Sequence, residues 1–169
     1  MTNLGDDEHT FAVNISHAIT KKAPAVLTSV LGSCIGICLH EPNLKVGSLA
    51  HAMLPLYEDG SRRGKENPLK YCDSAIKFQV EELVKLGCKQ SNLVAKVIGG
   101  ARMFSRKGKD DVFNIGERNQ EVTIAVLKEL GIKIVAKDLG LDFGRAIEFD
   151  VETGSVVVKK AGGTHWKSF

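Results

Sequence analysis

Apolar and polar residues alternate along several short segments of the chain, and such alternation predicts β-strands. The first two segments are residues 11–15 and 24–30. Two further segments, CIGICLH (34–40) and KVGSLAHAML (45–54), flank residues 41–44, in which Pro and Asn occupy the central positions that suit a type I turn. We therefore expect an antiparallel hairpin in which Glu41 pairs with Leu44.

Two later segments carry apolar residues at helical spacing. The first stripe consists of Ile76, Val80, Leu83 and Val84, and the second of Val122, Ala125, Val126 and Leu130. Asp73 or Ser74 can cap the first helix and Asn114 the second, while Gly87 and Gly131 stand where each helix should end. A strand follows each glycine, at residues 92–98 and 132–140, so the two segments resemble a repeated αβ unit.

A second hairpin is predicted near the end of the chain, where residues 145–151 and 155–160 flank a turn containing Gly154. Together these elements predict one α/β (α+β) domain over residues 1–169. Residues 1–10 and 162–169 carry no such pattern, and we expect them to be flexible tails.

Composition narrows the class of protein. The 169 residues are 43% hydrophobic and 25% charged with a net charge of +3, which is typical of a globular domain and too weakly basic for a nucleic-acid partner. The acidic start and the lack of a long apolar run predict no secretory signal, no membrane insertion and a cytoplasmic location. The basic cluster at residues 61–70 also contains Gly, Asn and Pro, which favours a solvated loop.

The four cysteines are best interpreted as reduced thiols. A cytoplasmic protein keeps its thiols free, none of the four forms a C-x-x-C pair, and the histidines are dispersed. We therefore expect no structural metal and no cofactor. Cys38, Cys72 and Cys88 fit a role in packing.

One thiol and one imidazole stand out among small and apolar neighbours. The register that pairs Glu41 with Leu44 also places Cys34 directly opposite His51, with Cβ atoms about 4.5–5.5 Å apart. An adjacent imidazole can take the thiol proton and stabilise the thiolate below its usual pKa of about 8.5. A buried structural cysteine and a satisfied core histidine are the alternatives, and residue pattern alone leaves both open.

Four segments together resemble one known family. LGSCIGICLHEP, KVGSLAHAMLP, VIGGARMF and NIGERN, in this order, are similar to the signature segments of the CheD family of chemoreceptor glutamine deamidases. The resemblance implies a fold similar to the catalytic domain of the cytotoxic necrotizing factor toxins, with layered mixed β-sheets flanked by helices. It also implies a protein-glutamine glutaminase with a Cys-His-Thr triad at Cys34, His51 and Thr28. Thr28 is assigned by its offset of six residues from Cys34, and Ser29 is the alternative.

The resemblance also implies partners. Methyl-accepting chemotaxis receptors are the expected substrate, through their cytoplasmic region, although the sequence does not identify the target glutamines. The alternative function is a non-catalytic regulatory module that binds the phosphatase CheC. A metal protein that uses Cys34, Cys38, His40 and His51 is a third alternative. Leu141 departs from the family pattern, in which glycine is common at this position.

Overall fold

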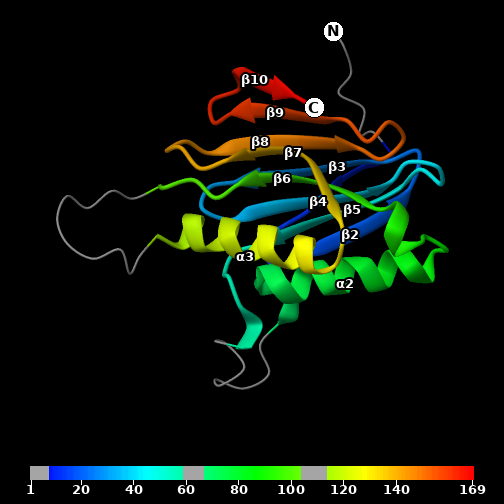
Figure 1. The fold of residues 1–169 in the computed structure, drawn as a ribbon. Helices are drawn as coiled ribbons and strands as arrows, with labels where there is room; N and C mark the ends of the chain where they lie inside the picture. Colours follow the sequence, from blue (N-terminus) through cyan, green and yellow to red (C-terminus); the bar gives the residue numbers. More distant parts are fainter. Residues whose placement is uncertain (1–7, 59–66, 104–113) are drawn as a thin grey trace, which may run out of the picture.

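The computed structural model describes residues 8–58, 67–103 and 114–169, and these form three layers (Figure 1). Sheet A has the strand order β1-β3-β8-β9-β10, and sheet B has the order β2-β5-β4-β6-β7. The strands of sheet A are β1 (Thr10–Ala12), β3 (Val26–Leu31), β8 (Arg145–Asp150), β9 (Val156–Lys160) and β10 (His165–Ser168). Those of sheet B are β2 (Ala18–Lys22), β4 (Ile35–Glu41), β5 (Val46–Ala52), β6 (Val94–Gly99) and β7 (Lys133–Leu139).

Helices α2 (Cys72–Lys85) and α3 (Ile115–Glu129) cover the face of sheet B that is turned away from sheet A (Figure 1). Two short 3-10 helices, η1 (Pro68–Lys70) and η2 (Gln90–Asn92), precede and follow α2. The mixed sheets and flanking helices confirm the predicted α/β (α+β) class. Sheet B is therefore the middle layer, and its central strands β4 and β5 are buried on both faces.

Two apolar cores result from this layering. Along β4 every residue is buried, and alternate side chains point to opposite cores. Ile35, Ile37 and Leu39 pack under the helices, whereas Cys38 packs in the core between the two sheets. Gly36, which lies on the same face as Cys38, is likewise directed towards sheet A, because a Cβ added there would meet Leu31.

Both helices end as their sequences predict. Gly87 has φ +93° and donates its N–H to Val84 O, while Cys88 N–H reaches Leu83 O, which is the pattern of a Schellman motif. Gly131, with φ +70°, ends α3 in the same way. The strands that follow, β6 and β7, are parallel neighbours, so the repeated αβ units lie side by side in sheet B.

The N-terminal caps were predicted less well. Asn114 does cap α3, since its side chain accepts a hydrogen bond from Glu117 N–H. The prediction of Asp73 or Ser74 for α2 was wrong. Tyr71 occupies the cap position without a side-chain hydrogen bond, and the Asp73 carboxylate instead accepts from Tyr57 N–H.

The ends of the domain also differ from the prediction. Residues 162–169 are not a tail, because β10 pairs with β9 and Trp166 packs against the inter-sheet core. Lys167 lies 3.5 Å from Asp138 of β7, so β10 is also joined to sheet B. Thr10 already belongs to β1, while residues 1–7 lie outside the described residues. The predicted strand at residues 11–15 overlaps β1, whereas the pattern missed the edge strands β2 and β10 because they contain few apolar residues.

Candidate active site

The turn that carries Cys34 connects the two sheets. β3 of sheet A ends at Leu31 and β4 of sheet B begins at Ile35, so residues 32–34 carry the chain from one layer to the other. Cys34 is half-buried and packs against the inter-sheet core, as Cys38 does four residues later. The thiol is therefore at the end of the inter-sheet face of sheet B, where solvent still reaches it.

The imidazole lies on the same face of sheet B, but the predicted register was wrong. His51 pairs with Gly36, not with Cys34. The hairpin joins Glu41 to Val46 through four residues, because Lys45 adopts a left-handed conformation with φ 53°. This longer loop shifts the register by two residues, an even number, so every side chain keeps the predicted face.

Cys34 and His51 are consequently diagonal neighbours across Gly36. Diagonal residues on one face of an antiparallel pair are typically about 7–8 Å apart at Cα, and long side chains reach across. A Cβ at Gly36 would lie 2.8 Å from Leu31 Cδ1, so a larger residue would displace the leucine at the base of the Cys34 turn. Although both residues are described, the thiol and the imidazole share no hydrogen bond in this structure, which is common before substrate binds.

A serine from the opposite sheet fixes the imidazole. Ser29 Oγ is 2.9 Å from His51 Nδ1 and donates its own proton to Val13 O at 2.7 Å. Since the single hydroxyl proton is used on Val13, Ser29 Oγ accepts from an Nδ1–H of His51. The proton of the neutral imidazole is thus on Nδ1, and Nε2 keeps the lone pair that can accept a proton.

Thr28, which the family resemblance placed in the triad, is not the residue that contacts the imidazole. Side chains alternate along β3, so Leu27, Ser29 and Leu31 are buried while Thr28 points to the other face of sheet A. The partner is Ser29, the alternative residue. The offset of six residues along the sequence therefore misses the contact by one position.

The three successive backbone carbonyls of the Cys34 turn, residues 32–34, accept hydrogen bonds from other segments of the chain. Gly32 O accepts from Ala101 N–H at 3.0 Å, and Cys34 O accepts from Gly100 N–H at 2.9 Å. Ser33 O accepts from the side chain of Asn119 at 3.1 Å. With every carbonyl of the turn directed inward to a donor, the thiol is held at a fixed position at the surface.

The Gly99-Gly100 pair allows this close approach. Gly99 has φ +114°, and a Cβ there would lie 2.3 Å from Cys34 O. Gly116 of the NIGERN segment has a similar role, because its Cβ would lie 2.6 Å from Gly100 O. At both motifs the absence of a side chain therefore lets backbone segments approach the site closely.

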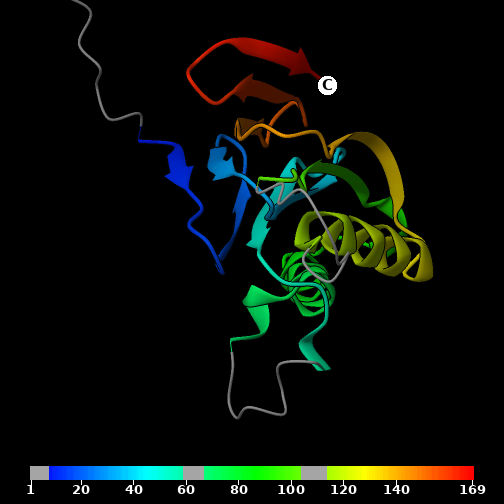
Figure 2. The same cartoon turned by 90° about the vertical axis from the view of Figure 1, so that its left-hand side faces the viewer.

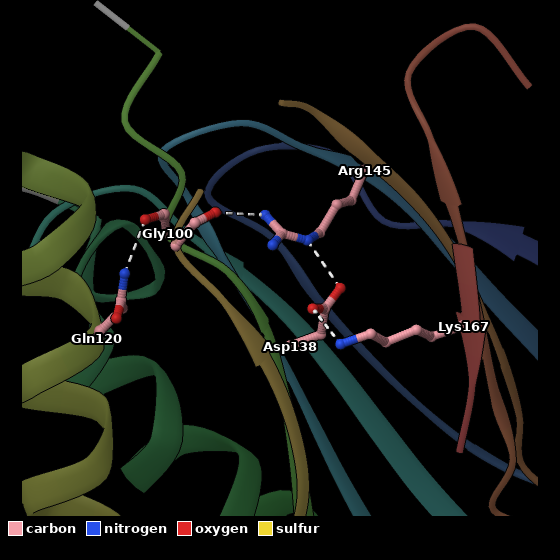
Figure 3. Close-up of polar contacts among 6 residues, drawn as sticks. Gly100, Gln120, Asp138, Arg145 and Lys167 are labelled. Atoms are coloured by element: carbon pink, nitrogen blue, oxygen red, sulfur yellow. Dashed lines mark hydrogen bonds and ion pairs between the residues drawn. The ribbon is translucent and has the colours of Figure 1, made fainter. Parts of the chain in front are cut away.

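A buried ion pair supports the same glycine turn (Figure 3). Arg145, fully buried, donates to the Asp138 carboxylate at 2.9 Å and to Gly140 O at 2.9 Å. Figure 3 also shows Gln120, whose amide donates to Gly100 O at 2.8 Å. The ends of β6 and β7 are thereby fixed to each other and to α3 at the edge of the molecule that faces the viewer in Figure 2.

A cavity of about 500 Å³ opens beside the imidazole. It is lined by residues of β1 and the segment that follows it, of β3, of β8 and of β9, including Thr28, Ser29 and His51. Glu148 and Lys159, 3.5 Å apart and each about half exposed, contribute to its lining. Cys34 is not among the lining residues, so the cavity reaches the imidazole and its serine partner but not the thiol.

Comparison with known proteins identifies the family. The family model for CheD, described as CheD chemotactic sensory transduction, matches residues 53–160. The probable chemoreceptor glutamine deamidase CheD of Desulfitobacterium hafniense is 50% identical over 149 residues, covering 88% of this chain and 91% of that protein. The chemoreceptor glutamine deamidase CheD of Thermotoga maritima is 44% identical over 147 residues, covering 87% of this chain and 88% of that protein. The chain belongs to the CheD family.

The region aligned with the Desulfitobacterium hafniense relative spans the positions of the candidate site, whereas the family model begins at residue 53, after them. An alignment of 149 of the 169 residues contains Ser29, Cys34 and His51 wherever it begins. Among solved structures, the hypothetical protein YfiH of Bacillus licheniformis matches with a TM-score of 0.46 and 10% identity, over 74% of this chain and 49% of that chain.

Burial controls the protonation of the pair in this CheD-family chain. It lowers the pKa of His51 below the usual 6.5, although a hydrogen bond with the Val13 carbonyl opposes the shift. Burial also raises the pKa of the Cys34 thiol to about 11, although the backbone N–H of Cys34 lowers it. This direction is opposite to the thiolate stabilisation that an adjacent imidazole can provide. At neutral pH the pair consists of a thiol and a neutral imidazole.

The remaining cysteines pack in the interior. Cys38, Cys72 and Cys88 are buried, and burial raises the pKa of the Cys38 thiol to about 12. In the described parts of the chain, no three His, Cys, Asp or Glu side chains form a group that could bind a metal ion. His40, one of the residues of the alternative metal-binding hypothesis, donates from Nε2 to Val151 O at 2.7 Å.

Two further features concern the surroundings of the site. Residues 61–66 of the predicted basic loop lie outside the described residues, and only its end is seen, as η1. Leu141 adopts φ 59° and is exposed, so it takes a left-handed conformation that glycine would adopt without strain.

No helix in the described residues is long and apolar enough to span a membrane.

Proposed function

We propose that this chain is a chemoreceptor glutamine deamidase that converts receptor glutamines to glutamate through a thioester on Cys34. The observation that supports it best is the arrangement of Cys34 and His51 on one face of sheet B, with Ser29 holding the imidazole so that Nε2 is the free nitrogen. The names of the relatives from Desulfitobacterium hafniense and Thermotoga maritima support the same activity.

The first half of the reaction forms the thioester. Cys34 Sγ attacks the side-chain amide carbon of the glutamine while His51 Nε2 takes the thiol proton, because the resting thiol is neutral. The carbonyl oxygen becomes an oxyanion. His51 then gives the proton to the amide nitrogen, the C–N bond breaks, and ammonia leaves.

The second half regenerates the enzyme. Water attacks the thioester carbon as His51 Nε2 accepts one of its protons, and the C–S bond breaks to release glutamate and return the proton to sulfur. A backbone N–H of the Cys34 turn would donate to the oxyanion in both halves. Ser29 keeps the imidazole in one orientation throughout, as the third member of a triad does.

The substrate reaches the site from a protein surface. Cys34 is half-buried at the edge of the sheets, so a glutamine side chain that projects from a receptor helix can approach it. We infer that the methyl-accepting receptors present their cytoplasmic region to this edge, and that the reaction takes place in the cytoplasm.

Intact-mass analysis tests the proposal. Incubating a receptor cytoplasmic fragment with the purified protein should raise the fragment's mass by the amide-to-acid difference for each converted glutamine, with release of an equal amount of ammonia. Peptide mapping should locate the change at glutamine side chains. A fragment whose mass and peptide map stay unchanged, with protein known to be folded, would overturn the proposed function.

The roles of Ser29 and Thr28 can be separated. Ser29→Ala should lower kcat about tenfold, because losing one orienting hydrogen bond costs about 1.4 kcal/mol in the transition state. Thr28→Val, which removes a hydroxyl while keeping the side-chain shape, should leave kcat within about twofold of the parent. The measurement is the rate of ammonia release under saturating receptor fragment. A larger loss with Thr28→Val than with Ser29→Ala would show that the threonine orients His51 in solution.

A further inference from the structure

Asn119, on the second turn of α3, connects the two segments that carry the thiol and the imidazole. Its side-chain Nδ2 donates to Ser33 O and to Met53 O, each at 3.1 Å. Ser33 immediately precedes Cys34, and Met53 follows His51 by two residues. The residue is fully buried, so solvent does not compete for these hydrogen bonds.

This bridge lies where the strand ladder ends. The last pair between β4 and β5 is Ile35 with Ala52, and beyond it the two chains present carbonyls that cannot bond to each other. An –NH₂ group supplies two donors in one plane, which meets both carbonyls at once. Because both partners are acceptors, the orientation of the amide is fixed by its contacts. The spacing of the two segments at the catalytic end thus depends on one side chain.

The first turn of α3 packs close to the site and so places the Asn119 amide there. Asn114 caps α3, and Gly116 lets its first turn approach the Gly100 and Ala101 carbonyls, where a Cβ would lie within 2.7 Å of each. Asn119 follows Gly116 by three residues and therefore faces the same side. Its other atom, Oδ1, is buried without a hydrogen-bond partner among the described residues, which lowers the stability of the fold. Both hydrogens of the Asn119 amide nevertheless form hydrogen bonds to the segments that carry Cys34 and His51.

We propose that Asn119 is a positioning residue of the deamidation, which sets the separation between Cys34 and His51 through their backbones. This inference rests on the proposed function. Leucine at this position would keep the approximate volume and remove both donors. Without the bridge the ends of the two segments are free to separate, and a misplacement of about 1 Å between reacting groups can cost about a hundredfold in rate.

Gln79 provides a matched control. It is also a fully buried amide on a helix, α2, and it donates from Nε2 to Ile37 O at 2.8 Å and to Ser48 Oγ at 3.1 Å. Its Oε1 is likewise without a hydrogen-bond partner in the described structure. Gln79 therefore bridges β4 and β5 as Asn119 does, but in the middle of the strands and away from Cys34.

The test compares Asn119→Leu with Gln79→Leu in the full chain. We expect Asn119→Leu to lower kcat for the receptor fragment by about 10- to 100-fold with little change in KM, and Gln79→Leu to keep kcat within about twofold at a similar loss in denaturation midpoint. Asn119→Gln, which keeps the amide one methylene further out, should retain more kcat than Asn119→Leu and serves if the leucine variant does not fold. Unchanged kcat in Asn119→Leu, or an equal loss in Gln79→Leu, would overturn the positioning role.

A second readout separates this inference from the proposed function. If the parent protein releases no ammonia, the proposed function fails. The separation of Cys34 and His51 can then still be tested by the rate at which iodoacetamide alkylates Cys34. Asn119→Leu should slow this alkylation as His51→Ala does, because both remove the imidazole from reach of the thiol proton. Alkylation of Asn119→Leu at the parent's rate would overturn the positioning role.

Discussion

Replacing Cys34 with alanine should abolish receptor deamidation, with a loss of at least about 10⁴-fold in kcat, because no other group in the site can form the thioester. Cys34→Ser should be comparably inactive, since a hydroxyl is a much weaker nucleophile than a thiol. Cys34 is half-buried and its side chain is small, so the alanine variant should fold normally. The rate of ammonia release and the far-UV circular dichroism spectrum measure the two effects.

Cys38→Ala is the matched control for the nucleophile. Cys38 lies on the same face of β4 but is fully buried, so its removal should cost about 1 kcal/mol of stability and leave kcat near that of the parent. Deamidation that persists in Cys34→Ala would refute the assignment. An inactive but folded Cys38→Ala protein would refute it as well, because the reacting thiol would then be the buried one.

Replacing His51 with glutamine should lower kcat by about 10²–10⁴-fold, the range expected for loss of a general base. The resting thiol, with a pKa of about 11, does not ionise by itself at neutral pH, so the reaction depends on Nε2 to remove the proton. His40→Gln is the control, because His40 is also buried between the sheets but contacts Val151 instead of the site. Equal losses in the two variants would indicate a general effect on folding.

His51 also sets the pH dependence of kcat/KM. Protonated His51 cannot act as a base, so kcat/KM should rise with pH as the imidazole loses its proton. Burial lowers the pKa of His51 below 6.5, which places this acid limb below pH 6.5 and leaves most of the imidazole neutral at pH 7. A profile of kcat/KM against pH measures it. An acid limb above pH 7 would contradict a buried neutral imidazole as the base.

The sequence by itself determined the local conformations. The Leu-Gly pairs at Gly87 and Gly131 predicted both helix ends, because a left-handed residue after a helix is encoded within a few positions. The alternation of side chains along residues 34–40 and 45–54 predicted the hairpin and placed Cys34 and His51 on a common face. The prediction of a common face was right although the predicted register was wrong, because a shift of two residues leaves every side chain on the same face.

The contacts of the site were decided only by the tertiary structure. The left-handed Lys45 made Gly36 the residue opposite His51, and no propensity distinguishes this loop from the predicted turn. Ser29 reaches the imidazole because β3 belongs to the other sheet and turns its odd-numbered side chains inward. Asn119 lies 85 residues beyond Cys34 and meets the site only where α3 packs on sheet B. Sequence patterns report which face a side chain occupies, whereas the partner across a layer boundary depends on how separate elements pack.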